Sequence, residues 1–563
     1  MGAERARADR ELSPQRASVD EDDDGALPVA PWVPPQLPFF LFALTVRLAL
    51  AGAPHSGMAT PPRFGDYEAQ RHWMEVTNAL PSGEWYRDSL PVNDLDYWGL
   101  DYPPLSAYLA WFAGKVAGAI GLARLVEPLT SHGIEDAGSK AFMRLSVVLL
   151  DCALLFPVIR VLVRLLWRRH AVVDRKSPAW PRLRRWAAFR IQTGWLIGAL
   201  LPLAVLVDHG HFQYNGVALA LALGVVAACG QGKHWPAAVL GVACVNFKQI
   251  GLYYVPAWGV FYLARLVLER RLRLFLLLVS AALTAQVLIL APLVYGAHAG
   301  GVPPDAVLLD LVHRMFPWNR GLFEDKVANF WCATHPVARW KDRFERPQLR
   351  NMCLLATAVV LVPLVVRLVV LALRRCARGP VGSAAARFSS RVNDMTVLLY
   401  AMTVSALAFF LFAYQVHEKS ILFALVPLTM LYHHMPVIVA HANVVAVFSC
   451  LPLLVRDGLL VHSLALVLLF LLVHHAVAGH EAVPKDARAR AGLALSFAGM
   501  GVLTLLLAYY PAGTALPIVG TRFPDLVSVA VASFSFLHIG ALLVYLLATG
   551  PEPLLAASKA KAD

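Results

Sequence analysis

Charged residues are scarce in this chain of 563 residues. They make up 15% of the sequence against 58% hydrophobic residues, and the mean hydropathy is +0.57. So little charge argues against a soluble protein of this length. The few charges are also unbalanced, with a formal net charge of +13. In a membrane protein this excess indicates basic cytosolic loops, and nucleic acid is not an expected partner.

Several common motifs are missing as well. The seven cysteines form no Cys-x-x-Cys pair, so neither a disulfide framework nor a zinc site is indicated. No Gly-rich phosphate loop followed by Lys-Ser/Thr is present, which argues against ATP-driven transport. No cleavable signal peptide is visible either. Residues 1–35 are charged and Pro-rich, which predicts a disordered cytosolic tail.

Long hydrophobic runs are what the chain has in abundance. Runs of roughly 18 or more residues recur from Pro38 to Leu546, which predicts an all-α polytopic membrane protein. We expect one multi-span membrane domain over residues 36–548 and a cytosolic tail over 549–563. Fifteen segments are candidate spans. The amphipathic segment 104–122 is the one expected to lie at the membrane interface instead.

Basic loops orient these spans. Arginine-rich loops near residues 168–190, 270–273 and 374–391 are predicted to be cytosolic, as is the N-terminal tail. Counting spans outward from these loops places four polar clusters together on the opposite side, which we call the far side. The four clusters are residues 55–103, 208–215, 298–349 and 415–420.

The first far-side cluster combines acids with aromatic residues. Asp66 and Glu68 lie two residues apart, and Asp66 is expected near the N-terminus of a short interfacial helix, where an acid is favoured. Capping explains a lone acid, but the density of polar residues favours a functional role. Asp101 precedes Tyr102-Pro103-Pro104, so it either caps the next helix or binds substrate.

The remaining clusters are rich in cations and amides. In Asp208-His209-Gly210-His211-Phe212-Gln213-Tyr214-Asn215 the two histidines could bind a metal, but hydrogen bonds to a polar substrate are favoured. Lys248 interrupts an apolar stretch, so it is either functional or part of a structural ion pair. Cations can hold a phosphate, aromatic residues suit sugar rings, and a carboxylate can take a proton from a hydroxyl.

These clusters closely resemble a known family. The carriers are Gly65–Trp73, Trp98–Leu105, His209–Asn215, Arg320–Asn329 and Gln415–Ser420. They are similar to the eukaryotic endoplasmic-reticulum glucosyltransferases of asparagine-linked glycosylation, which use dolichyl phosphate β-glucose as donor. Trp98-Gly99-Leu100-Asp101-Tyr102-Pro103-Pro104-Leu105 resembles the enzyme adding the first glucose in α1,3 linkage to mannose. The sister adding the second glucose typically has Thr at Gly99 and Phe at Leu105.

The resemblance implies a GT-C fold whose first luminal loop, residues 55–140, carries the catalytic acid. That acid maps onto Asp66 as general base, with Glu68 as the runner-up. The implied reaction inverts the β donor to an α product without a metal or other cofactor. His417, Lys419, Arg320 and His211 are the cations implied to stabilise the leaving phosphate. The full set of expected substrate-binding residues is Asp101, Tyr102, His209, His211, Gln213, Tyr214, Arg320, Glu324, Lys326, His417, Glu418 and Lys419.

The resemblance also implies the partners and location. The partners are the donor, a dolichyl-diphosphate-linked high-mannose oligosaccharide and membrane lipid. Lys559 and Lys561 resemble a dilysine retrieval signal, which supports the endoplasmic reticulum and a cytosolic C-terminus. Two cytosolic ends require an even number of spans, which leaves about fourteen. The alternatives are the sister enzyme, a dolichyl phosphate mannose-dependent mannosyltransferase, and a lipid-sugar transporter.

Overall fold

The computed structural model describes residues 37–168, 180–268, 270–316, 321–323, 325–377, 384–517 and 523–555. Within these ranges every regular element is helical, so the expected all-α class is confirmed. The predicted N-terminal tail and the two lysines of the C-terminal signal lie outside them.

Eight helices among the described residues are long and apolar enough to cross a membrane. They are Ala137–Trp167 (α6, η3 and α7), Gln249–Leu268 (η6 and α12), Leu272–Ala299 (α13), Arg346–Ala377 (α17), Ser390–Phe412 (within α18, Ala384–Phe412), Leu460–Glu481 (α22 and η8), Ala487–Tyr509 (α23) and Leu526–Thr549 (α24). The chain is therefore a multi-pass membrane protein.

Further apolar helices bear on the count of spans. Arg185–Ala199 in α8 and Pro202–Phe212, which comprises α9 and η5, form a ninth candidate bent by 42°. Four shorter apolar helices are α2 (Leu37–Ala49), α10 (Asn215–Gly230), α11 (His234–Phe247) and α20 (Pro436–Ser449). α5 (Pro104–Ala119), which covers the segment expected at the interface, belongs to neither group. The expected total of about fourteen depends on how many short helices cross.

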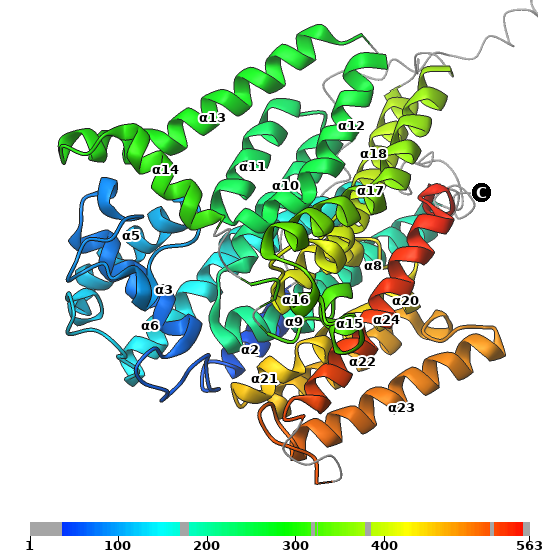
Figure 1. Cartoon of the computed structure of the whole chain (residues 1–563). Helices are drawn as coiled ribbons and strands as arrows, with labels where there is room; N and C mark the ends of the chain where they lie inside the picture. Colours follow the sequence, from blue (N-terminus) through cyan, green and yellow to red (C-terminus); the bar gives the residue numbers. More distant parts are fainter. Residues whose placement is uncertain are drawn as a thin grey trace, which may run out of the picture.

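Three helices form the centre of the bundle. Every residue of α19 (Leu422–Met430) is buried, nearly every residue of α10 is buried, and 89% of the apolar window of α18 is buried. By contrast, 6% of the corresponding window of α13 is buried, and α13 runs along the rim of the molecule in Figure 1. A rim helix can keep apolar side chains exposed because lipid tails solvate them.

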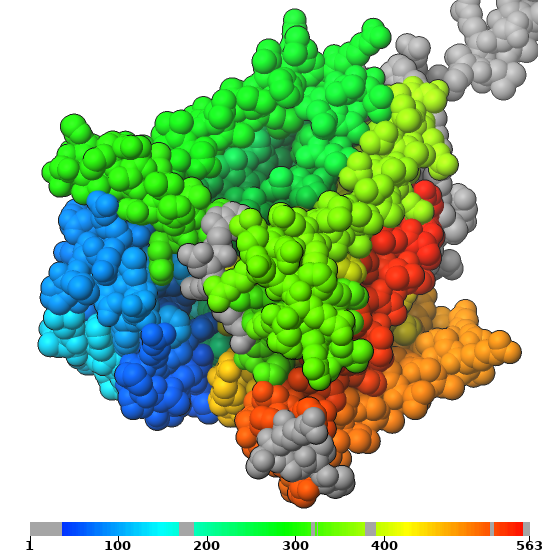
Figure 2. Space-filling model, viewed as in Figure 1, coloured from blue at the N-terminus to red at the C-terminus, as the bar shows by residue number. Residues whose placement is uncertain are grey.

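The segment between α2 and α6 packs as a layer of short helices. It contains α3 (Gly65–Ala79), α4 (Leu95–Trp98) and α5, drawn in blue in Figure 1. Trp73 Nε1 donates to the Trp98 carbonyl at 3.0 Å, which joins α3 to α4. Arg314 of α14 (Pro304–Met315) donates to the Leu100 carbonyl at 3.0 Å. On the face shown in Figure 2, the green surface adjoins the blue surface of this layer.

A buried ion pair ties α2 to the bundle. Arg47 Nε lies 2.7 Å from Asp151 Oδ2, and the two side chains are 2% and 5% exposed. His209 Nε2 lies 2.9 Å from the same oxygen. Removing one partner of such a pair leaves an uncompensated buried charge.

We therefore expect Arg47→Met to lower the stability of the protein by about 3–5 kcal/mol. The matched control is Arg124→Met, which breaks the exposed pair between Arg124 and Asp136 at 2.8 Å and should cost less than about 1 kcal/mol. Thermal unfolding in detergent compares the two variants. Equal shifts in the midpoint would contradict the structural role of the buried pair.

Candidate active site

A tight turn positions the N-terminus of α3. Gly65 has a φ of +71°, and a Cβ there would lie 2.7 Å from Ser56 Oγ and 2.8 Å from the Gly57 nitrogen. Only glycine permits this close approach of backbone segments. The Asp66 amide then donates to Ser56 Oγ at 3.2 Å. Asp66 thus occupies the first turn of α3, where the helix dipole favours an acid.

One oxygen of Asp66 gathers three donors. Asp66 Oδ2 lies 2.6 Å from Gln213 Nε2, 2.7 Å from Lys419 Nζ and 3.0 Å from His211 Nε2. The Asp66 side chain is 29% exposed, whereas Lys419 is 13% and His211 is 1% exposed. The carboxylate is therefore reachable from outside while its cationic partners are held in the protein.

Two of the three donors come from irregular helical segments. His211 lies in the π-helix η5 (Leu206–Phe212), which ends at Phe212 with a φ of +91°. Lys419 lies in the 3-10 helix η7 (Glu418–Ile421). π-Helical turns and strained backbone are concentrated at functional sites. The segments 208–215 and 415–420, predicted to share the far side, thus converge on Asp66.

A second carboxylate binds the other ring nitrogen of His211. Asp457 follows α21 (Leu451–Arg456), and its Oδ2 lies 2.5 Å from His211 Nδ1. Asp457 is buried, with a side chain that is 3% exposed. The imidazole therefore sits between two carboxylates, an arrangement in which both ring nitrogens can donate a hydrogen bond.

An amide network supports the site from inside. Gln213 Oε1 accepts from Lys248 Nζ at 3.0 Å and from Asn215 Nδ2 at 2.9 Å, which directs the Gln213 NH₂ group at Asp66. Lys248 Nζ also donates to Asn215 Oδ1 and lies 4.7 Å from the centre of the Tyr102 ring. Lys248 therefore orients amides in the wall behind Asp66.

The charges around Asp66 favour its ionised form. Burial acts to raise the pKa of Asp66, but Lys419 and His211 outweigh burial and hold the pKa well below its usual value. Burial likewise acts to lower the pKa of Lys419, but Asp66 and Glu418 outweigh it and raise the pKa. The pair is ionised at neutral pH.

Glu68, the predicted runner-up base, is placed differently. It is 1% exposed, and its two oxygens accept from Arg71 at 2.6 and 2.8 Å. The Tyr97 hydroxyl donates to it at 3.0 Å. Both oxygens are therefore occupied inside the protein, so the geometry favours a structural role for Glu68 over the reserve role assigned from sequence.

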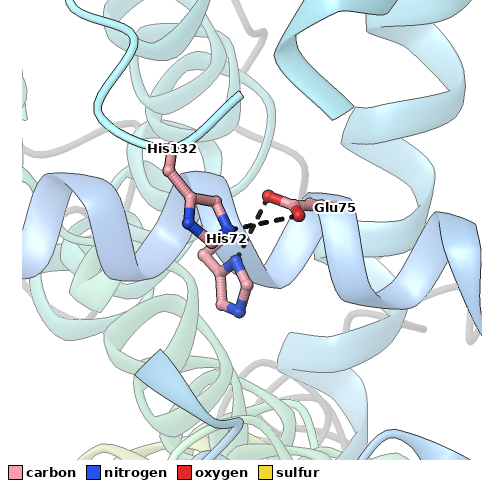
Figure 3. Close-up of side chains that lie close together, drawn as sticks. All are labelled: His72, Glu75 and His132. Atoms are coloured by element: carbon pink, nitrogen blue, oxygen red, sulfur yellow. Dashed lines mark hydrogen bonds and ion pairs between the residues drawn. The ribbon is translucent and has the colours of Figure 1, made fainter. Parts of the chain in front are cut away.

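A group of possible metal ligands adjoins Glu68. His72, Glu75 and His132 have ligand atoms within 4.8 Å of one another, and Figure 3 shows both imidazoles beside the Glu75 carboxylate. However, Glu75 already accepts from Arg71 at 2.8 Å and from the Leu129 amide at 2.8 Å. A guanidinium on the same carboxylate disfavours a divalent cation, so this group is better explained as a buried ion-pair cluster.

The two histidines of His209-Gly210-His211 do not share a ligand. His209 Nε2 lies 2.9 Å from Asp151, whereas His211 contacts Asp66 and Asp457. The two rings serve separate carboxylates, so the metal site considered from the sequence is not formed by this pair. His209, with Arg47 and Asp151, belongs to the buried ion-pair network of the fold.

Other predicted substrate residues lie at varying distances from this centre. Tyr102 lies against Trp73, with ring centres 4.8 Å apart, and near Lys248. The Tyr214 hydroxyl is 2.7 Å from Ser146 Oγ, and Lys326 Nζ is 2.9 Å from Asp525. His417 is exposed beside Lys419, whereas Glu418 is buried. Arg320 and Glu324 lie outside the described residues.

Asp101 does not cap the following helix. The N-cap of α5 is Pro103, and Pro104 is its first residue. Asp101 is therefore not the N-cap considered from the sequence, because the helix begins two residues later than a cap at Asp101 would require. The Asp101 carbonyl instead accepts from Gln249 at 3.1 Å.

Sequence reasoning missed Asp457. The charged pair Arg456-Asp457 interrupts two apolar runs on the side where the other clusters were predicted, and this was the available signal. Nothing in the sequence pairs Asp457 with a histidine 246 residues earlier.

The sequence of the chain matches a known family and several of its members. The profile of the ALG6, ALG8 glycosyltransferase family matches residues 43–545. A probable dolichyl pyrophosphate Man9GlcNAc2 alpha-1,3-glucosyltransferase of Arabidopsis thaliana is 34% identical over 79% of this chain and 75% of its own length. The enzyme so named in Saccharomyces cerevisiae is 34% identical over 76% and 72%, and that of Gallus gallus is 31% identical over 90% and 94%.

A buried histidine beside the site generates a pH prediction. His55 is 1% exposed and stacks on Tyr67 with ring centres 3.9 Å apart. Burial lowers the pKa of His55 from 6.5 to about 4. The unfolded chain therefore takes up this proton at a higher pH than the folded protein, so stability is lost as the pH falls from about 6.5 towards 4.

We expect His55→Phe, which keeps a ring on Tyr67, to remove about 2 kcal/mol of the destabilisation between pH 7 and pH 5. The unfolding midpoint measured at both pH values gives the difference. His480→Phe, at an exposed position, is the matched control and should leave the pH dependence unchanged. Parallel pH dependence in wild type and His55→Phe would contradict the assignment.

Proposed function

The chain belongs to the ALG6, ALG8 glycosyltransferase family, and from this premise we propose that Asp66 is the general base of a glucosyl transfer at the far face of the membrane. The observation that supports this role most strongly is the convergence of Lys419, His211 and Gln213 on one oxygen of Asp66. A partly exposed carboxylate meets cations there, as a base beside a leaving phosphate requires.

We propose dolichyl phosphate β-D-glucose as the donor and dolichyl-diphosphate-linked Man9GlcNAc2 as the acceptor. The product is an α1,3 linkage to a terminal mannose, formed in the lumen of the endoplasmic reticulum. The names of the related enzymes support the acceptor and the linkage. The cations beside Asp66 support a donor that carries phosphate.

The reaction is a single displacement. Asp66 takes the proton of the acceptor 3-hydroxyl while that oxygen forms a bond to the anomeric carbon of glucose. The bond from this carbon to the phosphate oxygen breaks, and its electron pair leaves with dolichyl phosphate. A phosphate leaving group needs positive charge rather than an acid, and Lys419 and His211 are the cations beside the base.

Three further residues of the predicted site have supporting roles in this proposal. His417 is exposed beside η7 and offers a further donor for the phosphate. Tyr102 presents an aromatic ring behind the site, which suits a sugar face. Gln213 directs an amide at Asp66 and is fixed by Lys248, so it holds the carboxylate in place.

We expect Asp66→Asn to reduce glucose transfer by about 10²- to 10⁴-fold, because the amide cannot accept the hydroxyl proton. The assay combines purified protein, dolichyl phosphate glucose and lipid-linked Man9GlcNAc2, and measures the glucosylated product. Asp96→Asn, at an exposed acid of the same loop, is the matched control and should retain activity.

Retained transfer by a folded Asp66→Asn variant would remove Asp66 as the base. The same assay separates the alternatives for the whole chain. Preference for an acceptor that already carries one glucose would indicate the sister enzyme, and better use of dolichyl phosphate mannose would indicate a mannosyltransferase. No transfer from either donor by a folded wild type would favour a transporter.

The second proposal under this function is metal independence. The protein cations already supply positive charge next to Asp66, so we expect full activity in excess EDTA or 1,10-phenanthroline. Rates measured before and after dialysis against chelator test this expectation. Loss of activity that a divalent cation restores would contradict it and direct attention to His72, Glu75 and His132.

A further inference from the structure

The two oxygens of Asp66 differ in their surroundings. Oδ2 accepts from Gln213 and faces both Lys419 and His211. Among the described residues, none places a donor within hydrogen-bonding distance of Oδ1. One oxygen is thus held by the protein, while the other is left for the acceptor hydroxyl.

The cations next to Asp66 also contact each other. Lys419 Nζ lies 3.0 Å from His211 Nε2, and both lie within 3.0 Å of Asp66 Oδ2. Two positive groups at this distance repel each other unless negative charge lies close to both. Asp66 provides that charge next to Nε2 of the His211 ring, and Asp457 provides it next to Nδ1.

This arrangement creates a conflict for a base. The cations that stabilise ionised Asp66 also reduce its affinity for a proton, because protonation would discard two favourable interactions. A donor phosphate brings a second negative group to the same cations. Once they turn to the phosphate, the carboxylate loses part of its stabilisation and becomes a stronger base.

We propose that Lys419 and His211 are a shared cationic pair that passes from Asp66 to the donor phosphate, so that donor binding itself activates Asp66 as the base. The inference rests on the proposed function and adds an order of events to it. In the free enzyme Asp66 is held ionised and weakly basic. With the donor in place, its basicity rises where the acceptor hydroxyl approaches Oδ1.

The charges of the transfer step fit this exchange. The phosphodiester donor carries one negative charge, and the departing dolichyl phosphate monoester gains a second as the bond to the anomeric carbon breaks. Asp66 becomes neutral in the same step because it receives the acceptor proton. Negative charge therefore leaves Asp66 as it grows on the phosphate, where the two cations already lie once the donor is bound.

Asp457 is the positioning residue of this device. Its buried carboxylate accepts from His211 Nδ1, which fixes the ring with Nε2 directed at Asp66 and Lys419. It also supports a positive imidazole when Asp66 is neutral. Asp457 has no contact with Asp66 in the structure and acts through His211.

Other groups near Asp66 do not take part in the exchange. Lys248 is committed to Gln213 and Asn215, and Gln213 is a neutral donor whose contact with Asp66 persists in either protonation state. Ser56 binds the Asp66 backbone, and Tyr102 is neutral at physiological pH because burial raises its pKa. Among the described residues, Lys419 and His211 are thus the charged groups in direct contact with the carboxylate.

The test is the pH dependence of kcat and of kcat/KM for the donor. The acid limb of kcat/KM reports Asp66 in the free enzyme, and that of kcat reports it with substrates bound. For wild type we expect the kcat limb to lie at higher pH than the kcat/KM limb. In Lys419→Met the acid limb of kcat/KM should shift to higher pH by roughly 1–3 units, since one opposite charge is removed. The pH difference between the two acid limbs should therefore decrease.

Three further variants sharpen the test. Lys419→Arg keeps the charge and should restore the wild-type separation of the limbs in part, whereas Lys115→Met removes an exposed cation from α5 and should change neither limb. Asp457→Asn should lower kcat about tenfold, the loss expected for one charge-assisted hydrogen bond, with little change in the donor KM.

The outcomes separate this inference from the proposed function. If wild type forms no glucosylated product, the proposed function fails. If wild type is active and Lys419→Met raises only the donor KM, with both acid limbs unmoved, Lys419 is a phosphate ligand alone and the shared pair is overturned. Coincident limbs in wild type would overturn it as well.

Discussion

The contact between Asp66 and Lys419 is the interaction on which the rest of the site depends. It joins residues 353 positions apart, across 2.7 Å, in a chain that must keep its charges out of hydrocarbon. A charge placed near the membrane is tolerated when it is paired, so neither residue can be positioned without the other. His211 and Asp457 extend the pair into a row of charged groups of alternating sign. This row connects α3, η5, η7 and the end of α21.

The buried polar groups behind this row explain its rigidity. Gln213 transmits the position of Lys248 and Asn215 to Asp66, and Asn215 in turn donates to Asp208 at 2.7 Å. Each group in the chain satisfies the next, as polar atoms in a low-dielectric interior must be satisfied. A carboxylate supported in this way keeps one oxygen fixed, and the other is the oxygen proposed to take the proton. The partial exposure of Asp66 and the burial of everything behind it follow from the same arrangement.

The sequence was sufficient for the fold class and for part of the site. Long apolar runs specify a helical membrane protein because a helix satisfies its own backbone hydrogen bonds in lipid. The basic loops then assign each polar cluster to one side of the membrane. This assignment predicts that the clusters containing His211, Gln213 and Lys419 share one side with Asp66, and in the structure these side chains contact Asp66. The choice between Asp66 and Glu68 was supported only by family resemblance. Two residues apart on a helix they point about 200° apart, and packing decides which one faces Arg71 and which one faces Lys419. Asp457 was missed because its role depends on a tertiary contact with His211.

In the proposed mechanism, protein cations take the role that a metal ion has in other transferases. A divalent cation that coordinated both oxygens of Asp66 would occupy the lone pairs that a base must offer to the acceptor hydroxyl. It would also be repelled by Lys419 and by a protonated His211, which lie 3.0 Å apart. An ammonium group bound to Oδ2 leaves Oδ1 open and can move to a phosphate by rotation of its own flexible stem. Positive charge that moves with the reaction is thus compatible with a carboxylate base, whereas positive charge fixed on that carboxylate is not.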